Sequence, residues 1–367
     1  MTAEAKAMVL VRFEAPLEER SYPIPKLAPG ELLVKLTASG VCGSDVHMWL
    51  GQDPRTPLPI ILGHEGVGEV AEMGSGVTDI YGAPVRAGDP VFWDRGVACG
   101  RCHYCAVLRA PYLCPHRFVY GIHRPANQPP HLVGCYAEYL VLDAQTKVFS
   151  LVGHGVDPAV LVAAGCSGAT AAHALEMAPP RLGDVVVVQG PGPLGLFLAA
   201  MARRAGAREV VMIGGTAARL ALARSLGATR VLDRNSTTAS ERRQVVLDLT
   251  AGRGADIVYE AVGTASVVAE GLGLVRPGGA YVSAGFGQPG GTFPLDPFRD
   301  IVRKNVRMLG VWVSDTSHAE QALRLILAEP ESFAPIVSHR FPLAQATQAL
   351  LAMHRKEALK AVLVPGG

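Results

Sequence analysis

The pattern of hydrophobic and polar positions divides the chain into two regions with different predicted secondary structure. Roughly residues 31 to 150 contain short apolar runs that glycine and proline interrupt. Runs of this length between turn residues are typical of β-strands, so a mostly β region is predicted here. The clearest of these runs are Leu32–Leu36, Val67–Val70, Val91–Trp93 and Tyr139–Leu142.

From about Ala159 onward, helical and strand patterns alternate. Alternation of this kind predicts βαβ units and a parallel sheet with both faces covered, which is an α/β fold of the doubly wound, Rossmann type. The predicted helices are Ala159–Met177, Pro193–Ala205, Ala217–Leu226, Glu241–Leu249 and Ser266–Val275. The predicted strands are Asp184–Gln189, Glu209–Ile213, a short one around Val231, Asp256–Glu260, Ala280–Ser283 and Val306–Val313.

The C-terminal segment is predicted to rejoin the first part of the chain. It contains a helical pattern at Leu343–Met353 and a strand pattern at Ala361–Val364. We therefore expect one domain from residues 1–158 together with residues 311–367. A second domain, residues 159–310, would be inserted between these two parts.

Composition narrows the function classes. The 367 residues are 49% hydrophobic, which is enough to build roughly two buried cores. A net charge of +2 supplies no basic surface for nucleic acid or an acidic membrane. The first residues contain no signal-peptide pattern, and the apolar runs are too short to span a bilayer. We expect a cytoplasmic protein with no nucleic-acid or membrane partner.

The seven cysteines indicate metal binding rather than disulfides. An odd number of cysteines without a signal peptide argues against a disulfide framework. Cys99, Cys102, Cys105 and Cys114 lie close together, at the spacing of a closed tetrahedral zinc site. A structural zinc lobe is predicted at about residues 97–116. Cys135 lies alone in an apolar stretch and is predicted to be a small buried residue.

A glycine-rich turn follows the strand at Val185–Val188. Its sequence is Gly190-Pro191-Gly192-Pro193-Leu194-Gly195, and a helical pattern follows. In this context the glycines allow a tight turn, a close approach of the backbone to a pyrophosphate, and close packing of helix on strand. The helix N-terminus adds unpaired N–H groups for the phosphates. These residues are therefore predicted to bind a dinucleotide.

The choice between NAD and NADP stays open. An acid about 20 residues after the turn would accept hydrogen bonds from the adenosine ribose, but Gly214 and Gly215 occupy that place. Arg219 is the nearest basic residue that could bind a 2′-phosphate. Its presence is explained equally well if it lies on the solvent-exposed face of a helix.

A second set of metal-type ligands is spread over three segments. They contain Cys42, His64 with Glu65, and Cys166. Two cysteines and one histidine on a zinc ion leave the fourth tetrahedral position for water or substrate, as a catalytic zinc requires. Spacing alone does not join these residues.

Taken together, the motifs resemble those of the zinc-containing medium-chain alcohol dehydrogenases. The resemblance covers nearly the whole chain. It rests on Gly40-Val41-Cys42-Gly43-Ser44-Asp45-Val46-His47, Gly63-His64-Glu65-Gly66, the four-cysteine lobe, Cys135-Tyr136-Ala137-Glu138-Tyr139, the glycine-rich turn and Arg276-Pro277-Gly278-Gly279. It implies a GroES-like catalytic domain, a Rossmann domain, and two zinc ions per chain.

The resemblance also implies a role for individual residues. Cys42, His64 and Cys166 would hold the catalytic zinc, and the Glu65 carboxylate could move onto it. Asp45 would orient His64, Ser44 would bind the substrate oxygen, and His47 would end a proton relay. The cofactor contacts would come from Thr170 at the nicotinamide, Lys360 at the pyrophosphate, and Val262 and Gly263 near the dinucleotide.

The predicted function is hydride transfer between an alcohol and NAD or NADP, giving a ketone or aldehyde. We expect a small-molecule secondary alcohol, with cyclic or bulky alcohols included, and a homodimer or homotetramer. The alternative is a catalytically silent, zinc-binding structural or regulatory protein of the same fold.

Overall fold

The computed structural model describes residues 3–366 and divides the chain into two compact units. Unit 1 contains the described residues up to Cys166 and those from Ser314 onward, and unit 2 is Ser167–Val313. The second unit is therefore an insertion in the first. The boundaries differ from the predicted ones at 158/159 and 310/311. The first boundary lies later in the chain because residues 158–165 pack on strands of unit 1.

Unit 1 is mostly β-structure. Its strands are β1 (Glu4–Leu10), β2 (Glu18–Pro23), β3 (Leu32–Val41), β4 (Ile60–Ile61), β5 (Gly66–Met73), β6 (Pro90–Trp93), β7 (Gly96–Val97), β8 (Phe118–Val119), β9 (Tyr139–Leu142), β10 (Val148–Ser150), β17 (His339–Pro342) and β18 (Ala361–Val364). Its helices are α1 (Gly43–Trp49), η1 (His103–Val107), η2 (Pro111–Leu113), α2 (Pro158–Leu161), η3 (Val162–Gly165), α8 (Thr316–Ala328), α9 (Pro330–Phe333), η5 (Ala334–Ile336), η6 (Leu343–Gln345) and α10 (Ala346–His354).

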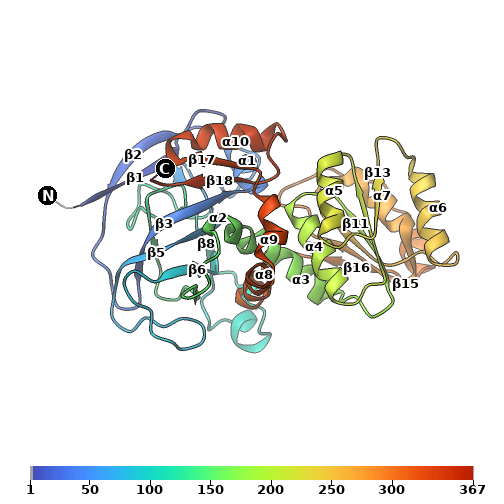
Figure 1. The fold of residues 1–367 in the computed structure, drawn as a ribbon, viewed down its shortest axis with the longest axis horizontal. Helices are drawn as coiled ribbons and strands as arrows, with labels where there is room; N and C mark the ends of the chain where they lie inside the picture. The colour runs from blue at the N-terminus through green and yellow to red at the C-terminus, as the bar shows by residue number, and fades with distance from the viewer. Residues whose placement is uncertain (1–2, 367) are drawn as a thin grey trace. The chain divides into compact units, whose positions relative to one another are not determined.

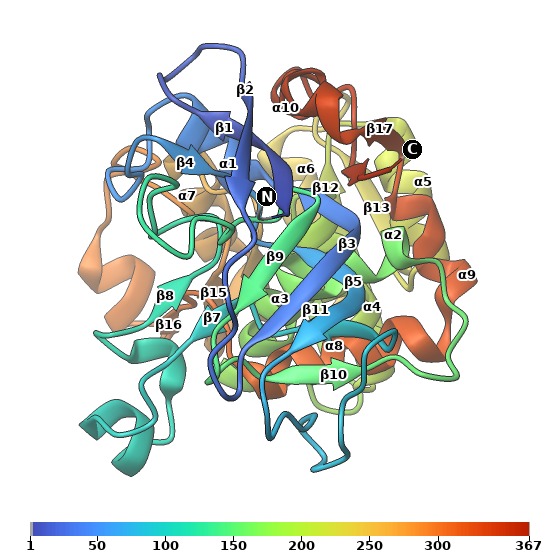
Figure 2. The ribbon, with the colours of Figure 1, turned by 90° about the vertical axis from the view of Figure 1, so that its left-hand side faces the viewer.

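The main sheet of unit 1 has the strand order β10-β6-β5-β3-β18-β17, and β9 pairs with β3 off this path. Figure 2 shows β3, β5 and β9 side by side. Within the sheet, β18 is antiparallel to β3, with Ala361 opposite Val41. The C-terminal strand therefore completes the sheet of the first residues, as the sequence predicted.

Unit 2 contains a single parallel sheet with the strand order β13-β12-β11-β14-β15-β16, together with helices (Figure 1). Helices α3, α4 and α5 pack as one group, and α6 packs with α7. The chain order reverses beside β11, the position at which Rossmann folds bind dinucleotides. The strands are β11 (Val185–Gln189), β12 (Glu209–Gly214), β13 (Arg230–Asp233), β14 (Ala255–Glu260), β15 (Val275–Ser283) and β16 (Arg307–Gly310). The helices are α3 (Ser167–Met177), α4 (Pro193–Arg204), α5 (Ala217–Ser225), α6 (Ala239–Leu249), α7 (Ala265–Leu274) and η4 (Pro297–Val302).

The helix predicted at Ala159–Met177 is wrong as one element. Cys166 leaves the helical conformation, with φ −126° and ψ −70°, and separates η3 from α3. Before this break, α2 contacts β3 and β5 and is anchored by the buried residues Val160 and Leu161. The break gives the Cys166 thiol a direction that an unbroken helix would not.

Among residues 3–366, no single helix is long and apolar enough to cross a membrane. Only the broken pair Pro158–Gly165 and Ser167–Met177 reaches that length and composition when its parts are taken together.

Candidate metal centre and dinucleotide loop

Three segments of unit 1 bring the first set of metal-type ligands together. Cys42 follows β3, His64 and Glu65 precede β5, and Cys166 follows η3. The donor atoms of these four residues all lie within 4.8 Å of one another. The two sulfurs, Cys42 Sγ and Cys166 Sγ, are 3.8 Å apart. Two thiolates on one tetrahedral zinc, at a Zn–S distance of about 2.3 Å, are about 3.8 Å apart as well.

Asp45 fixes the orientation of this cluster. It is fully buried on α1. One carboxylate oxygen lies 3.1 Å from His64 Nδ1. The other accepts from the Cys42 backbone N–H at 2.8 Å and from the Tyr136 hydroxyl at 3.2 Å. A carboxylate on Nδ1 leaves Nε2 of the imidazole to face a metal.

The open atoms of the cluster fit a zinc ion. Among the described residues, His64 Nε2 and Glu65 Oε1 are buried and have no hydrogen-bond partner. Buried polar atoms without a partner are rare and call for a ligand. Two sulfurs, an imidazole nitrogen and a nearby carboxylate are a donor set that zinc prefers over hard cations.

Lys360 forms a buried ion pair beside this cluster. Its Nζ contacts Glu65 Oε2, and the two side chains are 1% and 0% exposed. Gly40 makes room for this pair, since a Cβ at that position would lie 2.0 Å from Glu65 Oε2. Lys360 is therefore the buried counter-ion of Glu65, and its contact with a pyrophosphate stays a prediction.

Sequence reasoning missed Arg95, a buried cation beside the cluster. Its Nη2 lies 3.5 Å from Ser314 Oγ, and its Nε has no hydrogen-bond partner among the described residues. The hydrogen bond from Cys42 and then the charge of Arg95 outweigh burial and lower the pKa of Cys166 to about 7. The charged pair Asp94-Arg95 directly after the buried strand β6 was the only signal in the sequence.

Ser44 and His47 lie on α1 next to Cys42. Ser44 Oγ is 3.9 Å from Cys42 Sγ. His47 Nδ1 is 2.8 Å from Gln52 Oε1. Both side chains are partly exposed, so solvent reaches this end of the helix.

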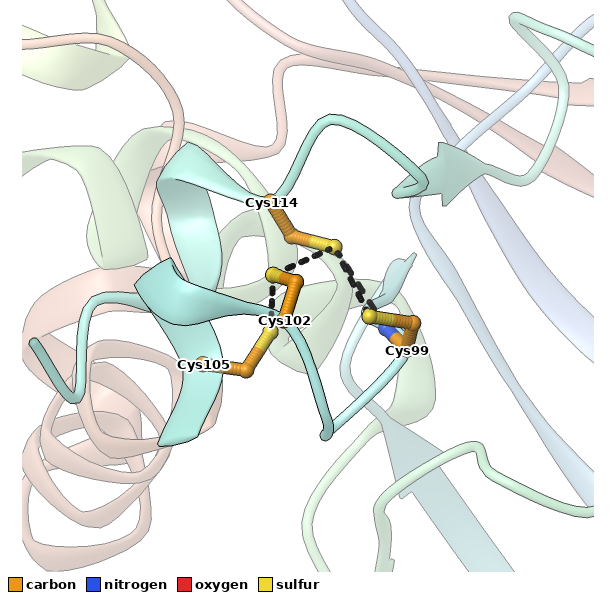
Figure 3. Close-up of side chains that lie close together, drawn as sticks. All are labelled: Cys99, Cys102, Cys105 and Cys114. Carbon is orange, nitrogen blue, oxygen red and sulfur yellow. Dashed lines mark hydrogen bonds between the residues drawn. The ribbon is translucent and has the colours of Figure 1, made fainter. Parts of the chain in front are cut away.

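The four-cysteine lobe forms a second cluster (Figure 3). Cys102 Sγ lies 3.5 Å from Cys105 Sγ and 3.8 Å from Cys114 Sγ, and Cys114 Sγ lies 3.5 Å from Cys99 Sγ. These are separations of thiolates around one ion, since a disulfide would be about 2.05 Å. Cys135 is buried and belongs to neither cluster.

The glycine-rich turn of unit 2 joins β11 to α4. Gly190 has φ +103°, which favours glycine. A Cβ at Gly195 would lie 1.8 Å from the Gly190 carbonyl oxygen, so the helix packs against the turn only without a side chain. A Cβ at Gly192 would meet nothing within 4 Å. The backbone before Pro193 and Leu194 therefore faces open space at the start of α4, where a phosphate would bind.

The other predicted cofactor residues are all in unit 2. Thr170 is on α3, and Gly214 and Gly215 end and follow β12. Arg219 is half-buried on α5. Val262 and Gly263 follow β14, and their backbone N–H groups donate to Glu260 Oε1 at 2.5 and 2.7 Å.

Comparisons with known proteins agree with this architecture. Residues 28–152 match the alcohol dehydrogenase GroES-like domain, and residues 193–328 match the zinc-binding dehydrogenase family. The 5-exo-hydroxycamphor dehydrogenase of Pseudomonas putida is 37% identical over 351 residues, 94% of each chain. An alcohol dehydrogenase structure from Thermotoga maritima has a TM-score of 0.96 and 44% identity, and the match covers 99% of this chain and 100% of that one.

A second solved structure extends the comparison to a bound cofactor. It is described as a zinc-binding dehydrogenase from Sinorhizobium meliloti bound to NADP. Its TM-score is 0.84 at 29% identity, over 99% of this chain and 100% of that one. With both domains matched and close relatives along nearly its full length, the chain belongs to the zinc-dependent medium-chain alcohol dehydrogenases.

Proposed function

We propose that this chain is an active enzyme that transfers a hydride between a secondary alcohol and NAD or NADP. The observation that carries the proposal is the convergence of Cys42, His64 and Cys166 on one point, with their donor atoms within 4.8 Å. A zinc ion held there would supply a Lewis acid for the alcohol oxygen. Two sulfurs and one nitrogen leave one tetrahedral position for that oxygen.

The ion pair of Glu65 and Lys360 places two opposite charges beside the proposed metal position. Glu65 shares its carboxylate with the buried ammonium of Lys360 and keeps Oε1 free. In this proposal the pair holds Glu65 beside the metal position while water or alcohol exchanges. Removing Lys360 would leave a buried carboxylate without its counter-ion, which is strongly unfavourable.

Ser44 and His47 would carry the proton of the alcohol outward. Ser44 Oγ lies beside Cys42 and can accept the alcohol proton. His47 is on the same helix and is partly exposed, and an imidazole ring can both accept and donate a proton in a relay. The proton would then pass to solvent through His47.

The choice of a secondary alcohol draws on the relatives. The Pseudomonas putida protein is named for 5-exo-hydroxycamphor, which is a cyclic secondary alcohol. We therefore propose bulky or cyclic secondary alcohols as the first substrates to test, with both cofactors, and the reverse reaction with the matching ketones.

The test compares two cysteine variants of the full chain. Cys166→Ala should reduce bound zinc from two ions per chain to one and lower kcat/KM by at least about 10³-fold. Cys135→Ala removes a buried thiol outside both clusters and should retain both ions and activity. Metal content is measured by mass spectrometry, and turnover by NAD(P)H absorbance across primary, secondary and cyclic alcohols.

Two results would contradict the proposal. Cys166→Ala with unchanged turnover would show that the assigned donors do not hold the catalytic ion. A wild-type chain that binds zinc and dinucleotide but turns over no alcohol or ketone in the panel would favour the silent structural or regulatory protein instead.

A further inference from the structure

The inference concerns the end of β12 in unit 2 and rests on the proposed binding of a dinucleotide. The Gly190 N–H donates to the Ile213 carbonyl at 2.9 Å, so the glycine-rich turn and the end of β12 are joined. In Rossmann folds the adenosine ribose lies at this end of the second strand. The residues that surround Gly214 and Gly215 therefore decide which ribose fits.

An acidic residue cannot be placed at the end of β12. A Cβ at Gly214 would lie 2.4 Å from Pro191 Cγ, 2.5 Å from Pro191 Cδ and 3.1 Å from Leu220 Cδ2. The ring of Pro191 fills the space that an aspartate side chain would need. A cofactor whose ribose 2′-hydroxyl depends on a carboxylate there loses that acceptor.

A basic residue from the neighbouring strand lies there instead. β13 runs parallel to β12, with Asp233 opposite Gly214, and the next residue is Arg234. The Arg234 N–H donates to the Gly214 carbonyl at 2.8 Å. Its side chain extends along Gly215, since a Cβ on that glycine would lie 3.2 Å from Arg234 Nε.

The guanidinium of Arg234 is available for a ligand. The side chain is exposed, and no acid among residues 3–366 pairs with it. The nearby carboxylate of Asp233 accepts from the Asn235 backbone N–H at 2.9 Å. Asn235 in turn donates from Nδ2 to the Gly215 carbonyl at 2.7 Å. The turn after β13 is thus held by its own hydrogen bonds, which leaves the Arg234 guanidinium for a ligand.

We propose that Arg234 binds a phosphate on the 2′-oxygen of the adenosine ribose and makes this chain selective for NADP(H) over NAD(H). A guanidinium binds phosphate through two parallel N–H···O bonds, which a ribose hydroxyl cannot match. The glycines at 214 and 215 place no negative charge beside the phosphate.

The experiment measures the affinity of the zinc-loaded full chain for NADPH and NADH by nicotinamide fluorescence. The wild type should bind NADPH at least about 10-fold more tightly than NADH. Arg234→Ala should weaken NADPH binding by about 10- to 100-fold and change NADH binding by less than about 2-fold, the range expected for loss of a charge-assisted bidentate pair. Arg234→Lys should recover part of the lost affinity, because lysine keeps the positive charge but cannot form the two parallel hydrogen bonds.

Arg230→Ala is the matched control. Arg230 is an exposed arginine at the opposite, N-terminal end of β13, and its replacement should leave both affinities unchanged. Arg219→Ala is the competing variant, and a loss of NADPH selectivity there with none at Arg234 would overturn the assignment. The affinities of the same variants for 2′,5′-ADP and 5′-AMP, which differ in the 2′-phosphate, repeat the test with the adenosine half of the cofactor alone.

The outcome separates this inference from the proposed function. A chain that oxidises alcohols but binds NADH as tightly as NADPH would overturn the role of Arg234 and support the enzyme. A chain that binds NADPH through Arg234 without any alcohol turnover would support the role of Arg234 and contradict the enzyme.

Discussion

Asp45 shows how one buried residue organises a metal centre. Burial raises the pKa of its carboxyl, but His64 and the Cys42 N–H outweigh that effect and lower it. The pKa of His64 is raised in turn to about 10, because Asp45 outweighs the opposing effect of burial. An ionised carboxylate with three hydrogen-bond partners can stay buried, so the imidazole keeps one orientation.

His123 is a single residue that should make unit 1 sensitive to acid. Burial, and then the charges of Arg55 and Arg117, lower its pKa to about 4. Its Nδ1 accepts the Val119 N–H at 2.9 Å, which a protonated ring cannot do. The folded pKa lies below the unfolded value of about 6.5, so the unfolded chain binds more protons between these pH values. The stabilisation is present above about pH 6.5 and is lost as the pH falls towards about 4.

We predict that His123→Asn removes this part of the pH dependence. The Asn oxygen can accept the same N–H but does not titrate. Between about pH 6.5 and about pH 4 the variant should lose about 1–2 kcal/mol less unfolding free energy than the wild type, a value discounted for partial exposure of the ring. The measurement is urea unfolding at several pH values. Parallel curves for the two proteins would show that His123 is not the group responsible.

At the scale of elements, α4 depends on two glycines in opposite ways. Gly195 lies inside the contact of the helix with the turn, and Gly192 faces open space. Gly195 is therefore needed for close packing of the helix on the turn, and we propose that Gly192 keeps the backbone accessible to a ligand. In this proposal the motif contains a structural and a ligand-binding position three residues apart.

We predict different outcomes for Gly195→Ala and Gly192→Ala. The methyl group at position 195 would meet the Gly190 carbonyl oxygen, so this variant should lose about 1–3 kcal/mol of stability without any ligand. The methyl group at position 192 meets no protein atom within 4 Å, so the Tm should stay within about 2 °C while dinucleotide affinity falls. Thermal unfolding and cofactor titration measure the two effects. Equal losses of Tm would contradict this division.

The zinc lobe is an element with almost no core of its own. No residue of η1 or η2 is buried. A segment with so little buried apolar surface cannot offset its ordering entropy, so we propose that a metal on the four cysteines fixes its shape. The lobe is joined to the rest of unit 1 by the pair β7–β8 and by Arg117, which donates to the Ser314 carbonyl at 3.2 Å.

At the scale of the whole molecule, both metal clusters belong to unit 1, and the glycine-rich turn belongs to unit 2. Removal of zinc should therefore expose backbone amides of unit 1 to solvent, and addition of cofactor should protect backbone amides of unit 2. This division follows from the insertion of residues 167–313 into the chain of unit 1.

We predict that hydrogen exchange of the intact chain separates the two units. Chelation should speed exchange around residues 96–119 and near Cys42, His64 and Cys166, and leave β11–β14 unchanged, because the donors lie in unit 1. NADPH at about 100 times its Kd should slow exchange at residues 190–195 and 213–219. Mass spectrometry of peptides from each unit measures both effects. Faster exchange of β11–β14 after chelation would contradict the prediction.

Much of unit 2 could be predicted because its elements are strong local patterns. The strand Val185–Gln189 and the helix Pro193–Arg204 lie within a residue of their predicted ends. The helix Thr316–Ala328 was missed, although Ala319, Ala322, Leu323 and Ile326 have helical spacing and Asp315 caps its first turn. The strands β1 and β2 were also missed. For β2 the reason is that it is almost wholly exposed and polar, so it has no alternation of apolar and polar residues.

The sequence alone determined the α/β class, the four-cysteine lobe and the glycine-rich turn, because each depends on residues close together in the chain. Only the tertiary structure decided the break at Cys166, the pairing of Lys360 with Glu65, the burial of Arg95 and the position of Arg234 beside Gly215. These contacts join segments far apart in sequence, or depend on the direction of one side chain. Local patterns carry no information about either.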